Sequence, residues 1–274
     1  MKPPRFDYVR PDTVEEALAV LADFGDEAQV IAGGQSLMAM LNLRLAGPRV
    51  LVDISRLEAL STCQETGDCL EIGAAVTQAD LLDRADLAEA VPLLALALPH
   101  VGHAQTRNRG TVCGSLAHGD PSSELPLCLA ALEGQVVLRS TRGERRLDAA
   151  QFQTGLLSTA READELIVAA RFPLRRAGAG HAFAEVARRH GDFAIVGLAA
   201  VAHDGQVRLG VAGIADRPEI REWPFEREDI DAVLNRLAWD LDAADDLHAS
   251  ARYRRDIVRG LGPKVIAEAR SCAN

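Results

Sequence analysis

The stretch that most constrains this chain runs from Gln105 to Pro126 and reads Q-T-R-N-R-G-T-V-C-G-S-L-A-H-G-D-P-S-S-E-L-P. It is poor in large apolar side chains, so we do not expect an ordinary core strand or helix here. Gly110, Gly114 and Gly119 allow positive φ angles and the close approach of a ligand to the backbone. In a chain otherwise rich in Ala, Leu and Val, the stretch therefore predicts a long binding loop.

A second glycine turn, Ala32-Gly33-Gly34-Gln35-Ser36, directly follows the apolar run Val30-Ile31. Backbone N–H groups converge on phosphate oxygens only where no Cβ atom blocks the approach. Either turn alone is also explained as an ordinary connection between elements. The two together predict a site for a ligand that carries a diphosphate.

Composition and charge exclude several classes of protein. The chain has 274 residues, 48% of them hydrophobic, which predicts a globular protein of two or three subdomains. The net charge of −10 argues against binding to nucleic acid. The apolar runs are too short to span a membrane, and residues 1–8 lack the apolar core of a signal peptide, so we expect a cytoplasmic protein.

The five cysteines include no C-x-x-C pair. This argues against a disulfide framework and against an iron–sulfur or zinc site in this chain. The histidines near the polar stretch have neither the spacing nor the acidic companions of a metal site. We therefore predict no metal ligands, and the sequence offers no convincing cluster of catalytic residues.

Hydrophobic patterning divides the chain into three parts. The first, residues 1–55, is predicted to contain a helix opened by Thr13 and Glu16 as a capping box, then strand, helix and strand over Gln29–Ala32, Leu37–Leu45 and Arg49–Ile54. The second, residues 56–176, combines strands and helices around the polar stretch and ends at a glycine-rich joint, where Phe183 breaks the dinucleotide-binding pattern begun by Gly178 and Gly180.

The third part, residues 177–274, is predicted to be a β-sheet backed by helices. Asp204-Gly205 is a strong signal for a two-residue hairpin turn, and a strand is expected over Phe183–Arg189. A helix is expected over Leu247–Arg259. We expect Gly260, Gly262 and Pro263 to interrupt it before a short helix over Lys264–Ala269.

Five blocks of the sequence are similar to those of one known family. They are Ala32-Gly33-Gly34-Gln35-Ser36, Arg107 to Ser115, His118 to Pro126, Asp164-Glu165-Leu166-Ile167 and Arg188 to Ala194. The chain resembles, over essentially its whole length, the FAD-binding medium subunit of molybdenum-containing hydroxylases, the xanthine dehydrogenase and carbon monoxide dehydrogenase family.

The resemblance implies an α+β fold. Residues 1–176 would form a two-subdomain FAD-binding domain similar to that of vanillyl-alcohol oxidase, and residues 177–274 the small C-terminal domain of the medium subunit. It also implies FAD bound without covalent attachment. The residues expected at the cofactor are Ala32, Gly33, Gly34, Gln35, Ser36, Thr111, Val112, Cys113, Gly114, Ser115, Glu124, Ile167 and Asp192.

The partners implied by the resemblance are a small subunit with iron–sulfur clusters and a large subunit with the molybdenum cofactor. This chain would pass electrons from those clusters through FAD to an external acceptor. The acceptor (NAD, a quinone, a cytochrome or oxygen) and the substrate are left open, because the substrate is decided in another subunit.

The sequence departs from the family pattern at three positions of the expected site. Cys113-Gly114-Ser115 stands where the family usually has Gly-Gly-Asn, and Glu124 stands where relatives carry Asp. Two other readings remain: a stand-alone flavin oxidoreductase of the vanillyl-alcohol oxidase type, and a non-redox module that binds a nucleotide. A yellow colour of the purified chain would separate the flavoproteins from the last.

Overall fold

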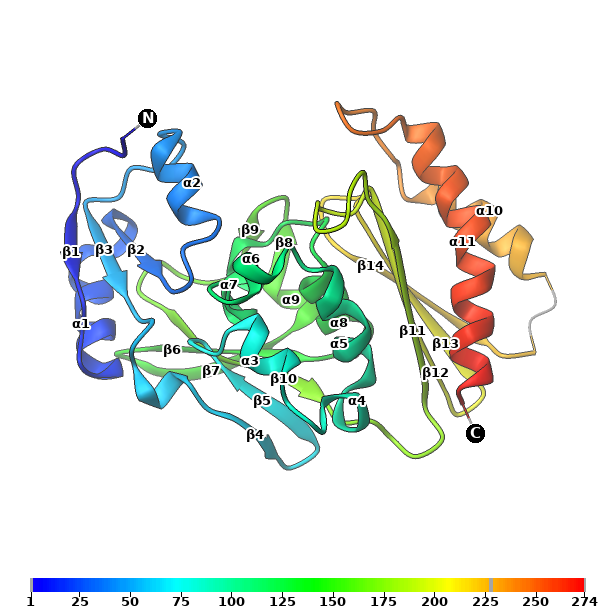
Figure 1. Ribbon diagram of the computed structural model, residues 1–274, viewed down its shortest axis with the longest axis horizontal. Coiled ribbons are helices and arrows are strands. Elements are labelled where there is room, and N and C mark those ends of the chain that lie inside the picture. Colours follow the sequence, from blue (N-terminus) through cyan, green and yellow to red (C-terminus); the bar gives the residue numbers. More distant parts are fainter. Residues whose placement is uncertain (1, 227–228, 274) are drawn as a thin grey trace.

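Three sheets stand side by side along the long axis of the molecule, with helices between and around them (Figure 1). The structure is a computed structural model that describes residues 2–226 and 229–273. No helix within these ranges is long and apolar enough to cross a membrane. The chain passes through the sheets in sequence order, so each large part of the sequence builds one block.

The first block is a parallel sheet in the order β1-β3-β2. Its elements are β1 (Asp7–Val9), α1 (Val14–Phe24), η1 (Gly25–Glu27), β2 (Ala28–Ile31), α2 (Leu37–Asn42) and β3 (Val50–Asp53). Thr13 is the N-cap of α1, as predicted, because its side chain accepts a hydrogen bond from the backbone N–H of Glu16. Glu16 accepts from the N–H of Asp12 and not from that of Thr13. The face of α1 that packs on the sheet is the apolar stripe in the sequence.

The second block is an antiparallel sheet in the order β4-β5-β10-β6-β7. Its strands are β4 (Cys63–Thr66), β5 (Cys69–Gly73), β6 (Gln135–Ser140), β7 (Gly143–Asp148) and β10 (Leu166–Pro173), with a small hairpin of β8 (Gln153–Gly155) and β9 (Ser158–Thr159). Its helices are η2 (Glu58–Leu60), α3 (Gln78–Leu82), α4 (Leu87–Ala90), α5 (Pro92–Ala97), η3 (Leu98–His100), α6 (Ala104–Arg107), α7 (Val112–His118), α8 (Glu124–Ala131) and α9 (Ala149–Phe152). One buried apolar cluster joins the first two blocks.

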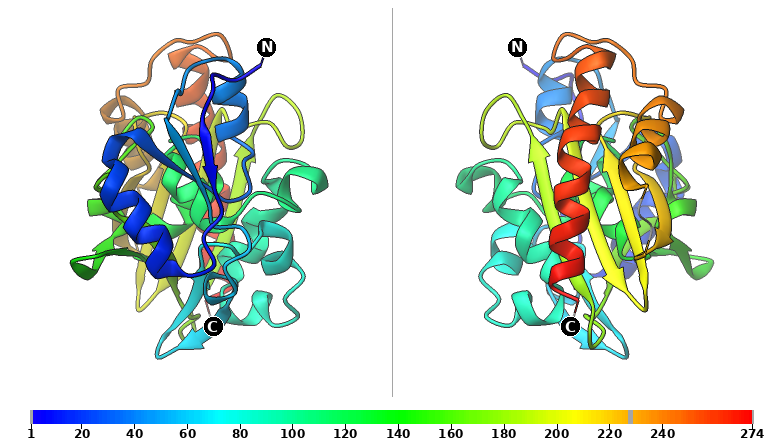
Figure 2. Two further views of the ribbon diagram at one scale, coloured as in Figure 1. Left: turned by 90° about the vertical axis from the view of Figure 1, so that its left-hand side faces the viewer. Right: turned by 90° about the vertical axis from the view of Figure 1, so that its right-hand side faces the viewer.

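The third block is an antiparallel meander of β11 (Gly180–Val186), β12 (Val196–His203), β13 (Gln206–Ala212) and β14 (Glu219–Pro224). The helices α10 (Ile230–Asp240) and α11 (Ala251–Ser271) cover one face (Figure 2). The helices α5 and α8 of the second block contact the strands as well, so the sheet lies between two layers of helices (Figure 1). The predicted hairpin turn is confirmed: Asp204 and Gly205 have φ angles of +49° and +72°.

The polar stretch from Gln105 to Pro126 is not the long loop that we expected. It contains α7 and parts of α6 and α8. The helix α7 forms because Thr111 caps it and because Val112, Cys113 and Leu116 give it a buried face. The prediction was wrong because packing of a small apolar face against the surrounding core stabilises a short helix in a stretch that is otherwise polar.

Element ends also differ from the prediction. The helix expected over Leu37–Leu45 ends at Asn42, and the strand expected from Phe183 begins at Gly180. The helix α11 runs without interruption through Gly260, Gly262 and Pro263. A single Pro removes one intrahelical hydrogen bond, and the packing of α11 along the third sheet offsets that loss.

Candidate functional site

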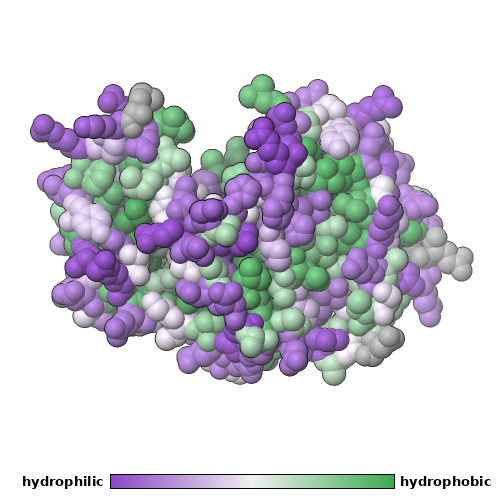
Figure 3. All heavy atoms as spheres, viewed as in Figure 1, coloured by the Kyte–Doolittle hydropathy of each residue, from purple (hydrophilic) through white to green (hydrophobic). Residues whose placement is uncertain are grey.

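A cavity of about 720 Å³ lies where the three blocks meet. Its walls come from the turn between β2 and α2, from α7, from the β8–β9 hairpin with β10, and from the loop before β12. The surface is hollowed between the lobe that carries α2 and the rest of the molecule (Figure 3). The site therefore depends on a fold that brings four separate segments of the chain around one space.

The two glycine turns predicted from the sequence touch each other in the cavity wall. A Cβ atom added to Gly33 would lie 1.9 Å from the carbonyl oxygen of Arg109, so no other residue fits at Gly33 without movement of the second turn. Gly34 has a φ angle of +70°, which L-residues rarely adopt. The glycines thus serve the contact between the turns as well as the approach of a ligand.

The second turn leads into α7, and Thr111 shapes its entry. The Thr111 side chain accepts a hydrogen bond of 3.0 Å from the backbone N–H of Gly114. A Cβ atom on Gly110 would lie 2.9 Å from Oε1 of Gln78. Gln78 is 4% exposed, and its Nε2 reaches the carbonyl of Thr111 at 3.5 Å.

The amide oxygen of Gln78 is a buried acceptor without a hydrogen-bond partner. Gln78 also lines the cavity. A buried polar atom without a hydrogen bond lowers the stability of the fold by about 1–3 kcal/mol, so such an atom in a native protein usually binds a ligand or a water molecule. No sequence pattern marks Gln78 as a site residue, because it stands at the start of an ordinary capped helix.

Cys113 lies in the cavity wall but is not a reactive thiol. It is 2% exposed, and its Sγ points to the carbonyl oxygen of Ile72 at 3.5 Å. Burial raises the pKa of the Cys113 thiol to about 12. Cys113 therefore stays protonated and packs as a small apolar group.

Glu124 is the only carboxylic acid among the described residues that line the cavity. It is 4% exposed at the first position of α8. Burial, followed by the nearby carboxylates of Glu185 and Asp120, raises the pKa of Glu124 to about 8. At neutral pH this side chain is mainly a neutral acid, able to donate one hydrogen bond and accept others.

Arg161 is a cavity residue that the sequence analysis missed, and among the described lining residues no other Lys or Arg occurs. Its guanidinium donates to the carbonyl oxygens of Glu162 and Glu165 at 3.0 and 2.7 Å. Burial lowers its pKa, but a guanidinium remains charged in proteins. The one sequence signal for Arg161 was that it lies three residues before Asp164, where one of the blocks shared with the family begins.

The structure gathers most of the predicted site residues around the cavity. The predicted residues that line it are Ala32, Gly33, Gly34, Gln35, Ser36, Thr111, Cys113, Gly114, Ser115, Glu124 and Ile167. Val112 is fully buried in the core, and Asp192 is exposed and is not among the lining residues. Its neighbours Gly191 and Phe193 do line the cavity, so the loop is near the site although the Asp192 carboxylate is not part of the wall.

The described residues include no group of three or more His, Cys, Asp or Glu side chains that could hold a metal ion. His118 lines the cavity, but as a single imidazole at the end of α7. The wall offers backbone N–H groups, hydroxyls, one cation and one neutral acid. That set suits an organic ligand with anionic oxygens better than a metal ion.

Residues 4–175 match the family described as "FAD binding domain in molybdopterin dehydrogenase". The chain belongs to the FAD-binding medium subunits of molybdenum hydroxylases. It is 38% identical over 283 residues to the 6-hydroxypseudooxynicotine dehydrogenase complex subunit alpha of Paenarthrobacter nicotinovorans. That alignment covers 98% of this chain and 96% of the relative. It is 35% identical to the nicotine 6-hydroxylase medium subunit of the same organism, in an alignment that covers 98% of this chain and 99% of that subunit.

Solved structures of the family share the whole fold of this medium subunit. Carbon monoxide dehydrogenase from Hydrogenophaga pseudoflava, in a form that lacks the Mo-pyranopterin moiety, aligns with a TM-score of 0.93 and 32% identity. The alignment covers 100% of both chains. The α+β architecture expected from the sequence is thus confirmed at the level of the complete medium subunit.

The residues of the cavity fit FAD. Its volume of about 720 Å³ lies within the ~300–1,000 Å³ of ligand sites in proteins. A Cβ atom on Gly33 or Gly110 would clash with neighbouring atoms of this chain, so only glycine allows the close packing of the two turns, and the unpaired oxygen of Gln78 is an acceptor in the wall.

Proposed function

We infer that the cavity holds FAD, with its diphosphate against the backbone N–H groups of Ala32 to Ser36 and of Thr111 to Ser115. The single observation that carries this assignment is the contact between Gly33 and Arg109, which brings both glycine turns to one wall. Arg161 supplies a positive charge in the same cavity, and Glu124 and Ile167 complete its wall. Asp192 does not line the cavity, and its contact with the cofactor stays a prediction.

FAD bound here accepts electrons from iron–sulfur clusters of a small partner subunit and passes them to an external acceptor. The protein positions the cofactor, excludes water from part of it and sets the charge around it. The molybdenum cofactor belongs to a large partner subunit, where the substrate is oxidised. We expect this assembly to be a heterotrimer, and its acceptor stays open.

The proposed role as an FAD-binding medium subunit also divides the chain into domains. Residues 1–55 and 56–176 form the two subdomains of an FAD-binding fold of the vanillyl-alcohol oxidase type, and residues 177–274 form the C-terminal domain. The separate apolar cluster of the third sheet and its helices supports this boundary. The expectation of a cytoplasmic protein stays a prediction.

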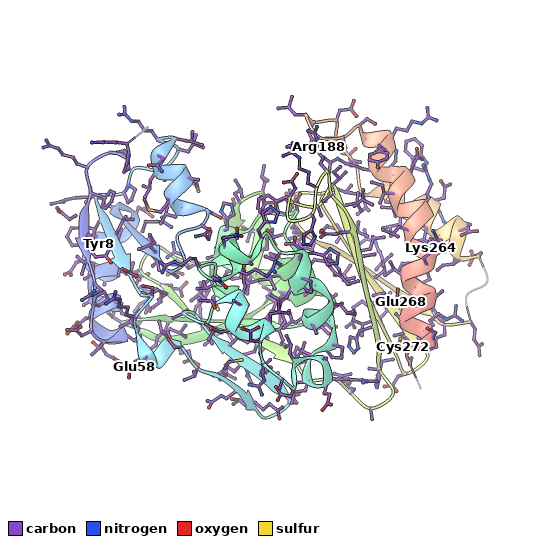
Figure 4. All side chains as sticks on the ribbon, in the orientation of Figure 1. Tyr8, Glu58, Arg188, Lys264, Glu268 and Cys272 are labelled. Carbon is purple, nitrogen blue, oxygen red and sulfur yellow. The ribbon has the colours of Figure 1, made fainter. Side chains whose placement is uncertain are left out.

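The partner that delivers electrons should dock at the mouth of the cavity. Two segments flank it: α2 with the residues that follow it, and the loop between β11 and β12, whose tip carries Arg188 (Figure 4). Leu43, Leu45 and Phe193 are 58%, 72% and 55% exposed there. Exposed apolar side chains beside a redox site are typical of a surface that another subunit covers.

Purification of the chain with its flavin tests the assignment. We expect a yellow protein whose FAD appears in the supernatant after acid precipitation, because the site provides only noncovalent contacts. Flavin that stays in the pellet would overturn the noncovalent reading. A colourless chain that shows no binding of added FAD would overturn the flavoprotein reading and favour the nucleotide module.

The stand-alone oxidoreductase is tested with the same preparation. The chain alone should accept electrons from dithionite but should reduce no dye with N-heterocycles, aldehydes or carbon monoxide as substrates. Substrate-dependent dye reduction at the rate of the complete complex would favour the stand-alone enzyme.

A further inference from the structure

Arg254, on α11, is a buried cation that joins three segments of the third block. It is 5% exposed. Its Nη1 donates a hydrogen bond of 2.7 Å to the carbonyl oxygen of Ile195 and another to the carbonyl oxygen of Gly213. Its Nη2 donates to Oδ2 of Asp246. Hydrogen bonds from a charged donor are roughly twice as strong as neutral ones, so this guanidinium holds its partners firmly.

Asp246 supports the guanidinium from the turn that precedes α11. Its Oδ1 accepts hydrogen bonds of 2.8 and 2.9 Å from the backbone N–H groups of His248 and Ala249. The side chain of Ser250 then caps the N-terminus of α11. Because the carboxylate is fixed by the backbone of its own turn, it also fixes the direction in which Arg254 points.

The contact with Ile195 reaches the cavity through the loop between β11 and β12. The backbone N–H of Ile195 donates to the carbonyl oxygen of Val186 at 2.7 Å and so closes the base of this loop. Gly191 and Phe193 of the same loop line the cavity. Arg254 holds the carbonyl oxygen of Ile195, and therefore determines where the loop joins the sheet.

Gly213 connects the guanidinium to a second part of the cavity wall. Its backbone N–H donates to the carbonyl oxygen of Pro121 at 2.9 Å. Pro121 belongs to the turn before α8, and Ser123 and Glu124 beside it line the cavity. Gly213 has a φ angle of +81°, and a Cβ atom there would lie 2.6 Å from the carbonyl oxygen of Ile195. Glycine is required for this close approach of the backbones.

Stability alone does not explain a buried arginine at this position. Burial of a charge costs free energy, and apolar side chains of similar size often stabilise a core equally well. The buried residues Ile257, Val258 and Val265 of the same helix pack in the third block without any charge. An apolar residue at position 254 could not hold two carbonyl oxygens and a carboxylate in fixed places.

We propose that Arg254 is a positioning residue of the FAD site. It holds the loop between β11 and β12 and, through Gly213, the turn before α8 in the places where both form the cavity wall. Arg254 is not among the described residues that line the cavity, so it acts through the backbone that it holds. The proposal rests on the proposed function, because the wall that Arg254 orders is the one assigned to FAD.

Titration of Arg254→Met with FAD tests the proposal. Methionine is also long and lets α11 pack, but it makes none of the three hydrogen bonds. We expect the dissociation constant of FAD to rise by at least about 10-fold, as it does for metals when a residue that orients their ligands is lost. Circular dichroism in the flavin absorption bands, measured at saturating FAD, should change as well. Trypsin should cut faster after Arg188 and Arg189, which are exposed in the loop.

Two controls on α11 separate positioning from stability. Val258→Ala removes apolar contacts from a fully buried position, so it should lower the urea midpoint without changing FAD affinity, flavin circular dichroism or trypsin cleavage. Arg252→Met removes a cation whose side chain is 89% exposed and should behave as the wild type. If Val258→Ala weakens FAD and opens the loop as much as Arg254→Met does, the positioning role is overturned.

Asp246→Asn keeps the test decisive if Arg254→Met does not fold. The Asp246 side chain is 47% exposed, so this nearly isosteric change should be tolerated. It places a neutral amide against the guanidinium in place of a carboxylate. FAD affinity should fall and trypsin cleavage should accelerate, both by smaller factors than in Arg254→Met.

The behaviour of the wild type distinguishes the two proposals. If the wild-type chain binds no FAD, the proposed function fails and the positioning role fails with it. If the wild type binds FAD and folded Arg254→Met has the same affinity and the same flavin circular dichroism, the positioning role is overturned and the FAD assignment stands. Wild-type affinity in Asp246→Asn has the same consequence if Arg254→Met does not fold.

Discussion

At the scale of single residues, Gly33 carries the sharpest steric demand in the site. Gly33→Ala would place a Cβ atom 1.9 Å from the carbonyl oxygen of Arg109 and force the two glycine turns apart. We expect the dissociation constant of FAD to rise at least about 10-fold, equivalent to ~1.4 kcal/mol. Fluorescence titration of the FAD-free wild-type and Gly33→Ala chains with FAD measures this dissociation constant.

Gly47→Ala is the matched control for Gly33→Ala. A Cβ atom at Gly47 would meet no atom within 4 Å, so FAD affinity should be unchanged. Circular dichroism would establish that both variants fold. Wild-type affinity in a folded Gly33→Ala protein would show that the contact between the turns does not shape the site.

The protonation of Glu124 predicts how stability depends on pH. Its pKa is about 8 in the folded chain, against an ordinary value of 4.5 when unfolded. Between these pH values the folded state binds the extra proton, so the stabilisation is present at low pH and is lost as pH rises toward 8. Each pH unit in this window changes the free energy of unfolding by up to ~1.4 kcal/mol.

Glu124→Gln removes this dependence. Relative to the wild type, the FAD-free variant should gain stability as pH increases from 5 to 9, measured by urea unfolding at each pH. Parallel pH profiles for the two proteins would mean that Glu124 is ionised in the fold at neutral pH.

At the scale of elements, α11 offers a matched pair of glycines within one helix. A Cβ atom at Gly260 would meet nothing within 4 Å, whereas one at Gly262 would lie 2.9 Å from Cδ1 of Leu234 on α10. Gly260→Ala should therefore raise the free energy of unfolding by about 0.5–1 kcal/mol through helix propensity. Gly262→Ala should lower it, because Leu234 must move.

Urea midpoints of the two variants check this pair. Equal stabilisation by both would show that α10 and α11 do not pack as closely as the structure has them. The exposed side of α11 is a separate surface, where Lys264 and Glu268 follow one another along the helix and Cys272 comes just after its end (Figure 4). Substitutions there should be nearly neutral.

The elements also show what the sequence could predict. Strands β2 and β3 and the Asp204-Gly205 turn could be predicted because β-branched residues and turn chemistry act locally. The helices within residues 105–126 and the uninterrupted course of α11 could not be predicted, because they depend on burial against segments that are distant in the sequence. Short edge strands such as β1 pair with a neighbour that local patterning does not reveal.

The same division holds for the site. Both glycine turns were predicted from their residues and Glu124 from the family resemblance, and all of them line the cavity. Gln78 and Arg161 were not predicted, because only the fold brings them to the cavity. Asp192 is exposed and does not line the cavity, whereas its neighbours Gly191 and Phe193 do, so its contact stays a prediction.

At the scale of the whole molecule, the apolar rim of the cavity predicts where the complex assembles. Leu43→Glu combined with Leu45→Glu should leave FAD bound but reduce co-purification with the small subunit, because charges would be buried in the interface. Co-expression of the variant with the small and large subunits, followed by a pull-down, measures how much small subunit co-purifies.

Ala88→Glu on α4, an exposed position far from α2 in Figure 1, is the control and should assemble normally. Normal assembly of the double variant would move the docking surface away from α2 and leave the loop between β11 and β12 as the remaining candidate.

The contact of Gly33 with Arg109 also limits how such a chain can be recombined. A chimera with its crossover just after β3 would inherit the first turn from one parent and the backbone on which that turn rests from the other. Mismatched parents would then produce proteins that fold but bind FAD poorly. A crossover near residue 176 keeps both turns from one parent, so exchange of C-terminal segments between relatives should preserve the flavin far more often than exchange of N-terminal ones.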